Sequence, residues 1–539
     1  MGLLSCRRAV GLPGLALLTS LACRGEASCA RCGTLVIAAV SEPGSLLPPL
    51  VQETVGRDIG DQVFERLANL APGGSPIDPG AYRPALATRW ERLDSLTWRF
   101  HLRPAARWHD GRTVTAGDVR FSFDAFGDSA LGAPARTYIA GRLEVVPEDS
   151  ATFLIRFAEP SAEQLYDATY HVRIVPEHIW GAKPRDAWAA DTSLARLVGS
   201  GPYRPSRWVR GQFLELVADS SSRPPAGIPR VIWRFTSDPD AALNLVLSHE
   251  ADVLETTLGP ERARRAADDT ALRLVPYPSA TFGFLGFNLL GLGGKPHPVL
   301  GDRETRRGLA LATDRSLLAR SAFGPEAEAP PGPMSRLLWI WSDSIPTLPF
   351  DRAEADRVLT AAGWRANARD GIRRRSGRSL ELDILVPSTS GTRRRLAEEL
   401  QQMWAGVGAR VTVSAVDFPV FQERLGAGRF DAYIGAWLDE PSPRALADQW
   451  SRAGWEGINY GRYASPRFDS LLSAAEREGR APEAARLYRE AVAQLNADAP
   501  AIFLYAPANI AVVSKRVEAF TIDPFSWASE LPRWRLTGP

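Results

Sequence analysis

Cysteine is nearly absent from this sequence: only four of its 539 residues are cysteines, and all four lie within the first 32 positions. The rest of the chain can therefore hold no disulfide, no cysteine-ligated zinc and no thiol nucleophile. An excess of charge is also absent, because 64 Lys and Arg balance 62 Asp and Glu, which gives no electrostatic case for nucleic-acid binding. With 45% hydrophobic residues, the chain can bury a large core. Its length predicts roughly three or four domain-sized units.

Recognisable catalytic patterns are missing as well. Residues 291–295 (GLGGK) have a faint likeness to a phosphate-binding loop, but Pro296 stands where that motif needs Ser or Thr. Residues 198–201 (VGSG) lack the spacing of a nucleophile elbow. The six histidines form no pair four residues apart of the kind that binds zinc on a helix. The sequence thus predicts neither an enzyme nor a metal or other cofactor.

Only one hydrophobic run stands out, residues 9–22, which follow Arg7 and Arg8. As a helix this run would rise about 21 Å, short of the ~30 Å hydrocarbon core of a bilayer. A positive start followed by a short apolar run is typical of a signal peptide. We therefore predict that residues 1–22 are an export signal and that residues 23–33 are a tether.

The cysteines cluster around the predicted end of that signal. The segment SLAC, which ends at Cys23, resembles a bacterial lipobox and predicts lipidation of Cys23. Ser20 stands where lipoboxes favour Leu, and Ser20 with Ala22 also satisfies ordinary signal cleavage, so plain secretion stays open. Cys29 and Cys32 lie in the tether, where we expect a local disulfide in an oxidising compartment. No second cysteine pair exists there to complete four metal ligands.

The body of the chain alternates predicted strands and helices. Segments rich in β-branched and aromatic residues predict strands at residues 34–40, 97–102, 152–157, 213–218, 231–235, 282–288, 380–386, 410–415 and 433–437. Start and stop signals, such as Asp351 before one helix and Gly363 after it, predict helices at residues 240–248, 303–323, 352–362, 392–407, 419–426 and 482–498. This alternation favours an α/β architecture with parallel strands. Without a fixed-period repeat or a long linker, the chain should form one multi-lobed body.

Residues 84–126 form the most specific block of the sequence. In it, Asp110-Gly111 predicts the tight turn of a hairpin, and Thr115 predicts a helix N-cap. The block (PALATRWERLDSLTWRFHLRPAARWHDGRTVTAGDVRFSFDAF) resembles the signature of the bacterial extracellular solute-binding proteins of family 5, which serve peptide and nickel ABC importers. Further blocks follow in the family's order at residues 198–203, 248–253, 287–288, 299–314, 354–363 and 459–471. The resemblance covers about residues 34–524.

The resemblance implies a periplasmic-binding-protein-like (type II) α/β clamp, with two ligand-closing lobes and an additional family-specific lobe. We predict lobe I at residues 34–60, 198–275 and 506–539, lobe II at 61–197, and lobe III at 276–505. Closure around a ligand would couple binding to recognition by an ABC transporter permease, without covalent chemistry. The implied function is capture of a solute outside the cytoplasm, foremost an oligopeptide. Contact with the membrane would run only through the lipid anchor, and no nucleic acid would be bound.

The resemblance also implies a ligand site. Peptide-binding members carry an Asp soon after a Trp, in a segment like residues 435–443 (GAWLDEPSP), and that Asp pairs with the α-ammonium of the ligand. Asp439 and Trp437 take these places, although the segment is one residue shorter and Ser442 replaces a second acidic residue. A helix-cap or surface-turn role for Asp439 is the alternative. The predicted ligand contacts are Asp439, Trp437, Asn459, Tyr460 and Asn288.

Other hypotheses stay open beside this one. Within the same class, the ligand could be a nickel chelate, an opine or an oligosaccharide. From another class, an exported hydrolase acting on peptides or esters would need a nucleophile–base pair, and the sequence shows none. A third hypothesis is a sensory or chaperone-like clamp that has no transporter.

Overall fold

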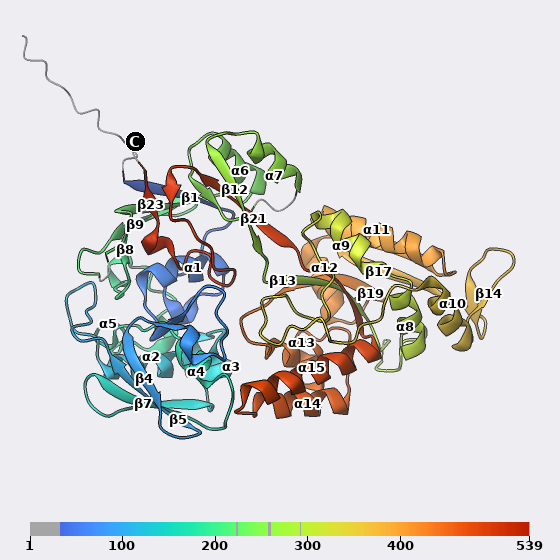
Figure 1. Ribbon diagram of the computed structural model, residues 1–539, viewed down its shortest axis with the longest axis horizontal. Coiled ribbons are helices and arrows are strands. Elements are labelled where there is room, and N and C mark those ends of the chain that lie inside the picture. Colours follow the sequence, from blue (N-terminus) through green and yellow to red (C-terminus); the bar gives the residue numbers. More distant parts are fainter. Residues whose placement is uncertain (1–32, 223–224, 257–259, 292, 538–539) are drawn as a thin grey trace, which may run out of the picture.

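The structure, a computed structural model, describes residues 33–222, 225–256, 260–291 and 293–537. Cys6, Cys23, Cys29 and Cys32 lie outside the described residues, so the signal peptide, the lipid anchor and the disulfide stay predictions. Figure 1 shows two bodies, with the N-terminal half and the C-terminal end on the left and most of the C-terminal half on the right. Each body is built on its own β-sheets. No helix in the described part of the chain has the length and apolar character that a membrane crossing requires.

Lobe I is built on a seven-stranded sheet that gathers strands from both ends of the chain. Its order is β12 (Leu272–Pro278), β21 (Ala508–Ser514), β11 (Val253–Leu254), β1 (Thr34–Ala39), β10 (Arg230–Phe235), β9 (Phe213–Ala218) and β8 (Tyr203–Val209). Every residue of β1 is buried, as expected of a central strand covered on both faces. Helix α6 (Pro239–Leu247) packs on one face of β1 and α1 (Thr54–Val63) on the other.

Lobe II contains a four-stranded antiparallel sheet in the order β4 (Ala87–Arg92), β5 (Thr97–Leu102), β7 (Thr152–Phe157) and β6 (Leu143–Pro147), with α2 (Ala116–Gly127) packed on β6. The predicted turn at Asp110-Gly111 is confirmed: Gly111 donates a hydrogen bond to the carbonyl of Trp108 at 2.8 Å, and its φ of 87° suits glycine. The predicted N-cap is confirmed too, because Thr115 forms a reciprocal capping box with Asp118. The turn and the N-cap of the block at residues 84–126 therefore have structural roles.

Lobe III contains a five-stranded sheet and most of the helices. The strand order is β18 (Arg410–Val416), β17 (Glu381–Pro387), β19 (Ala432–Leu438), β13 (Thr281–Phe287) and β20 (Ala501–Tyr505). Its main helices are α8 (Arg303–Leu311), α9 (Arg315–Phe323), α10 (Arg352–Ala361), α11 (Gly391–Ala405), α14 (Pro466–Glu476) and α15 (Ala481–Asp498). Helix α11 packs on β17 and β18, while α14 packs on α15.

The smaller elements of the chain are β2 (Ala68–Leu70), β3 (Tyr82–Pro84), α3 (Arg136–Ile139), α4 (Gln164–Thr169), α5 (Glu177–Trp180), α7 (Pro260–Ala267), β14 (Arg365–Ala366), β15 (Arg373–Arg375), β16 (Arg378–Ser379), α12 (Phe418–Gly426), α13 (Ala445–Trp450), β22 (Val517–Glu518) and β23 (Arg535–Leu536).

Two expectations about these elements are corrected. Parallel strands make up only part of the sheets: β1 runs parallel to β10 and β11, and β17 to β18 and β19, whereas pairs such as β8–β9 and β5–β7 are antiparallel. The single helix predicted at residues 303–323 is two helices, α8 and α9. They separate at Asp314, whose side chain caps α9 by accepting a hydrogen bond from the backbone N–H of Leu317.

Two extended connections join the two bodies (Figure 1). One leads from β12 into β13 and the other from β20 into β21, and the N–H of Ser279 donates to the carbonyl of Pro507 between them at 3.2 Å. Paired crossings of this kind are typical of a hinge. The strands of each main sheet fall within the range predicted for one lobe, except that β12 crosses the predicted boundary at residue 275. The exact lobe boundaries stay a prediction.

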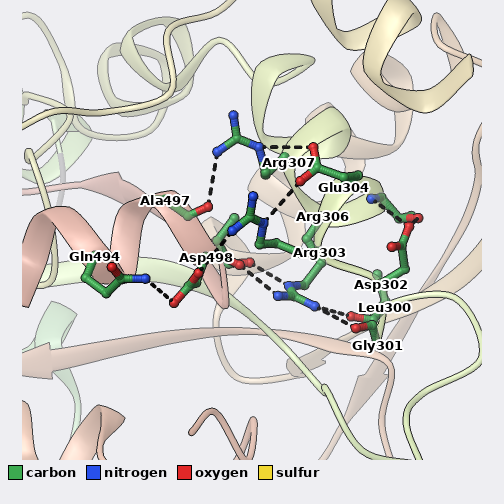
Figure 2. Close-up of polar contacts among 12 residues, drawn as sticks. Leu300, Gly301, Asp302, Arg303, Glu304, Arg306, Arg307, Gln494, Ala497 and Asp498 are labelled. Atoms are coloured by element: carbon green, nitrogen blue, oxygen red, sulfur yellow. Dashed lines mark hydrogen bonds and ion pairs between the residues drawn. The ribbon is translucent and has the colours of Figure 1, made fainter. Parts of the chain in front are cut away.

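One buried arginine of α8 holds the end of α15 (Figure 2). The guanidinium of Arg306 donates to the carbonyls of Asp498 and Ala499 at 2.7 and 2.9 Å, and to that of Leu300 at 2.7 Å. The last carbonyls of a helix have no partner within the helix. Arg306 supplies these partners and thereby fixes α15 against α8.

Candidate ligand cleft at the hinge

The loop that follows β19, residues 439–444, contacts both bodies. Glu440 forms an ion pair with Arg57 of α1, with 3.3 Å between Oε1 and Nη1. On the other side, the N–H of Asp439 donates to the carbonyl of Ala280, in the crossing from β12 to β13, at 2.8 Å. The 439–444 loop therefore touches lobe I and the hinge at once, and relative movement of the lobes changes its surroundings.

Asp439, the predicted amine-binding residue, is buried, with 6% of its surface exposed. Its Oδ2 accepts a hydrogen bond from the backbone N–H of Ser335 at 2.6 Å. Burial raises the pKa of the Asp439 carboxyl to about 7, and the bond from Ser335 offsets this only in part. Asp439 is therefore not part of a surface turn. It also caps no helix, because α13 begins only after Arg444.

Within the described part of the chain, no cationic side chain pairs with Asp439. A buried carboxylate without a cation is unfavourable when ionised, and an ammonium group at hydrogen-bond distance would remove that penalty. The geometry around Asp439 is therefore suited to a cationic ligand group.

Trp437, two positions before Asp439, lies against Tyr460. The ring of Trp437 stacks on Tyr460 at 6.5 Å and on Phe284 at 6.2 Å, with interplanar angles of 21° and 24°. Phe284 is fully buried, whereas Trp437 and Tyr460 are half-buried. Since side chains two positions apart in extended chain point to the same side, Trp437 shares a side with Asp439. The structure thus brings two of the five predicted contacts, Trp437 and Tyr460, together, and Asp439 follows Trp437 by two positions.

The two predicted asparagine contacts hold turns. The side-chain amide of Asn459 donates to the carbonyls of Ser451 and Tyr463 at 2.8 and 2.9 Å, and its oxygen accepts from the N–H of Tyr463. Asn288 likewise donates to the carbonyls of Gly428 and Phe430. Because both amides are buried and engaged by backbone groups, a ligand contact by either one stays a prediction without geometric support.

The sequence did not indicate a buried ion cluster that joins lobe II to lobe III. The Nη1 of Arg444 lies 2.6 Å from Oδ1 of Asp167, and its Nε lies 3.2 Å from Oε2 of Glu163. All three side chains are buried, and Ser442 donates to Glu163 at 2.8 Å. Burial opposes ionisation of Arg444, but the two carboxylates raise its pKa above the ordinary value. These residues, Glu163, Asp167 and Arg444, are called the interlobe ion cluster below.

A cavity of about 170 Å³ lies next to the Arg57–Glu440 pair. Its wall combines residues of lobe I, lobe II and the 439–444 loop, among them Tyr138 and Tyr170. Burial raises the pKa of Tyr170 to about 12, so its hydroxyl is neutral at physiological pH. Sequence reasoning did not single out these residues. The available signal was only the general one that aromatic residues near Gly- and Pro-rich turns line clefts.

The arrangement is suited to binding rather than to covalent chemistry. In the residues that the structure describes, no group of three or more His, Cys, Asp or Glu is placed to hold a metal ion. The polar groups at the hinge instead offer a buried carboxylate, an interlobe ion pair and aromatic surface. Charge pairing and apolar contact are the interactions that such groups provide.

Two α/β bodies, paired crossings and a charged loop at the hinge define a ligand-binding clamp. The family model described as bacterial extracellular solute-binding proteins, family 5 Middle, matches residues 81–457, which is most of the chain. The protein belongs to this family. It is therefore an extracytoplasmic solute-binding protein and not an enzyme, and the hydrolase alternative has no support.

Relatives and solved structures agree with this assignment. The oligopeptide-binding protein AppA of Bacillus subtilis (strain 168) is 21% identical and aligns over 94% of this chain and 92% of its own. The dipeptide-binding protein of Escherichia coli (strain K12) is 22% identical over 95% and 96%. Among solved structures, the ABC transporter substrate binding protein CtaP from Listeria monocytogenes has a TM-score of 0.81, 20% identity and coverage of 94% and 99%. NikZ from Campylobacter jejuni, in complex with Ni(L-His), has a TM-score of 0.76, 21% identity and coverage of 93% and 99%. The predicted type II clamp fold is confirmed.

Proposed function

We propose that this protein captures oligopeptides outside the cytoplasm by closure of its lobes and delivers them to the permease of an ABC importer. In this proposal Asp439 pairs with the amino terminus of the peptide, and Trp437 and Tyr460 form the wall beside it. The names of two relatives, an oligopeptide-binding and a dipeptide-binding protein, support the ligand class. The observation that carries the proposal is the buried carboxylate of Asp439 at the hinge, to which none of the residues that the structure describes supplies a cation.

Thermal unfolding of the purified protein with mixed di- to pentapeptides tests the proposal. A ligand that binds only the folded state stabilises it by about 2.7 kcal/mol at a hundred times Kd, so Tm should rise by several degrees. In Asp439→Asn the side chain can still accept the bond from Ser335 but cannot pair with an ammonium group, so the shift should be lost.

Asp383→Asn is a matched control for that experiment. Asp383 lies in β17 of the same sheet and accepts a hydrogen bond from the hydroxyl of Ser414 at 2.6 Å. This variant should keep the peptide-induced shift. A wild-type protein that is stabilised by a nickel chelate, an opine or an oligosaccharide, and by no peptide, would contradict the peptide assignment.

We also propose that Cys23 carries a lipid anchor once residues 1–22 are removed, and that Cys29 and Cys32 form a disulfide. The SLAC segment and the extracellular family support the anchor. Cell fractionation tests it: the wild-type protein should sediment with membranes, and Cys23→Ser should be released. If mass spectrometry finds a mature chain that starts at Cys23 without acyl mass, the anchor is wrong and plain secretion remains.

A further inference from the structure

The cavity beside the Arg57–Glu440 pair has an apolar and aromatic wall. Its lining includes Pro48, Val51, Phe126, Tyr138 and Tyr170. The ring of Tyr138 is held by stacking on His171, with centroids 4.3 Å apart and planes within 4°. Aromatic and aliphatic walls with few polar groups are the usual lining of a pocket that accepts an apolar group.

The ionisable side chains in this wall lie close to protein partners. Arg57 pairs with Glu440 at 3.3 Å, Arg173 pairs with Asp61 at 2.7 Å, and His171 lies 3.6 Å from Asp167. A charged ligand group that entered the cavity would lose its hydration, and in the described wall Nε2 of His171 is a buried nitrogen without a hydrogen-bond partner. The wall therefore favours a neutral group over a charged one.

Gly60 leaves room on the α1 side of the cavity. It lines the cavity, and a Cβ placed on it would meet only the carbonyl oxygen of Leu46, at 3.9 Å. Gly is a poor residue for a helix interior, where Ala or Leu would be favoured. A larger side chain at position 60 would therefore reduce the free space at this wall of the cavity.

The cavity also lies next to the proposed amine site. Glu440, which closes the cavity from lobe III, directly follows Asp439, and consecutive Cα atoms are about 3.8 Å apart. Consecutive side chains of an extended chain point to opposite sides, so Asp439 and Glu440 do not face the same space, but a peptide whose amino group reached Asp439 would lie within about one residue of the segment that closes the cavity. Because lobes I, II and III all contribute to the wall, the cavity is complete only when the lobes are together.

Resting on the proposed function, we infer that this cavity is a specificity pocket for an aromatic or large aliphatic side chain near the amino terminus of the ligand. It selects such peptides over those that carry a charged side chain at the same place. Gly60, Tyr138 and Tyr170 set the size and character of the pocket.

Calorimetric titration with tripeptides tests this inference. The peptides carry Phe, Leu, Ala, Lys or Glu at the first or second position, with Ala elsewhere. For the wild-type protein, Phe or Leu at one of these positions should bind at least about tenfold more tightly than Lys or Glu, because a buried large apolar side chain contributes that much. Gly60→Leu should fill the pocket and remove this preference, while the affinity for trialanine changes by less than about threefold.

Two further variants keep the test interpretable. Gly60→Ala adds a single methyl group and should give an intermediate loss of the preference, which provides a readout if Gly60→Leu fails to fold. Gly426→Leu, at an exposed helical glycine of α12 with open space around it, should leave the ranking unchanged. Equal affinity for all the tripeptides, or an equal loss for all of them in Gly60→Leu, would overturn the pocket but leave peptide binding intact.

If no peptide binds the wild-type protein, the proposed function fails, and indole then tests the pocket by itself. Indole should raise the Tm of the wild-type protein and of Gly426→Leu, but not that of Gly60→Leu. The absence of an indole effect on the wild-type protein would overturn the pocket as well.

Discussion

Asp439 is a buried carboxyl whose protonation should change when a ligand binds. Burial raises the pKa of its carboxyl to about 7, so the folded protein retains a proton that the unfolded chain releases above its ordinary pKa of 3.8. In that window the contribution of Asp439 to stability falls as pH rises, because the folded state binds more protons than the unfolded state. A bound ammonium group reverses this preference by stabilising the carboxylate. Peptide binding should therefore release a proton from Asp439.

The affinity for peptides should consequently depend on pH. Below about pH 7, Asp439 must give up its proton before it can pair with the ligand, and the affinity should fall by up to about tenfold per pH unit. Titration calorimetry between about pH 5 and pH 8, in buffers of different ionisation enthalpy, measures both the affinity and the proton released. Asp439→Asn should show a flat profile. A wild-type affinity that is constant over this range would contradict the assigned role of Asp439.

Among the elements, the C-terminal end of α15 receives two hydrogen bonds from one side chain that lies outside it. Arg306 is 4% exposed and satisfies the carbonyls of Asp498 and Ala499 at the helix end, as well as that of Leu300. Buried carbonyls that lose their donors each cost about 1–3 kcal/mol. Helix α15 packs on α14, so a fixed end of α15 also restrains α14.

Arg306→Ala should lower the free energy of unfolding by about 2–4 kcal/mol, because it leaves these carbonyls without partners. Chemical denaturation followed by tryptophan fluorescence measures the change. Arg307→Ala is the matched control: Arg307 is more exposed and donates to one carbonyl, that of Ala497, at 3.1 Å (Figure 2). Equal losses in the two variants would show that the bonds of Arg306 do not carry the effect.

Local elements were largely predictable because their determinants lie close together in the chain. Thr115 caps α2 through a residue three positions away, and each predicted strand appears in the structure within one or two residues of its expected ends. Strand direction was not predictable in the same way. β13 pairs with β19 and β20, which lie more than a hundred residues further along the chain, so local alternation of strands and helices did not report their orientation.

The candidate site was predictable only where a sequence pattern marks it. Asp439 and Trp437 lie in a segment that resembles the family, and the structure places them together with Tyr460. The interlobe ion cluster has no local signal, because 277 positions separate Arg444 from Asp167. The amides of Asn459 and Asn288 complete turns, and a sequence does not distinguish this role from a ligand contact.

At the scale of the whole molecule, the interlobe ion cluster is a buried charge network that depends on contact between lobes II and III. Arg444 reaches Glu163 and Asp167 across the boundary between lobes II and III, and all three are buried in this arrangement. Separation of the lobes would return these groups to water. The cluster therefore favours the closed arrangement only while all three partners are present.

Arg444→Met should shift the clamp toward an open arrangement, because it leaves two buried carboxylates without their cation when the lobes close. We expect at least about tenfold weaker ligand binding and faster release. Small-angle scattering with ligand present should give a larger radius of gyration than for the wild-type protein. Arg477→Met removes an ion pair with Glu159 across the same boundary, but that pair is exposed, so this control should bind like the wild-type protein. Wild-type affinity in Arg444→Met would contradict a role for the cluster in closure.

The most decisive measurement compares one peptide with a free amino terminus and the same peptide N-acetylated, each titrated into the wild-type protein and into Asp439→Asn. Acetylation removes the ammonium group and leaves the rest of the ligand unchanged. We predict that the wild-type protein binds the free peptide about a hundredfold or more tightly than the acetylated one, since a buried charge pair would be lost. In Asp439→Asn the two peptides should bind within about threefold of each other. Equal binding of both peptides to the wild-type protein would contradict amine recognition by Asp439.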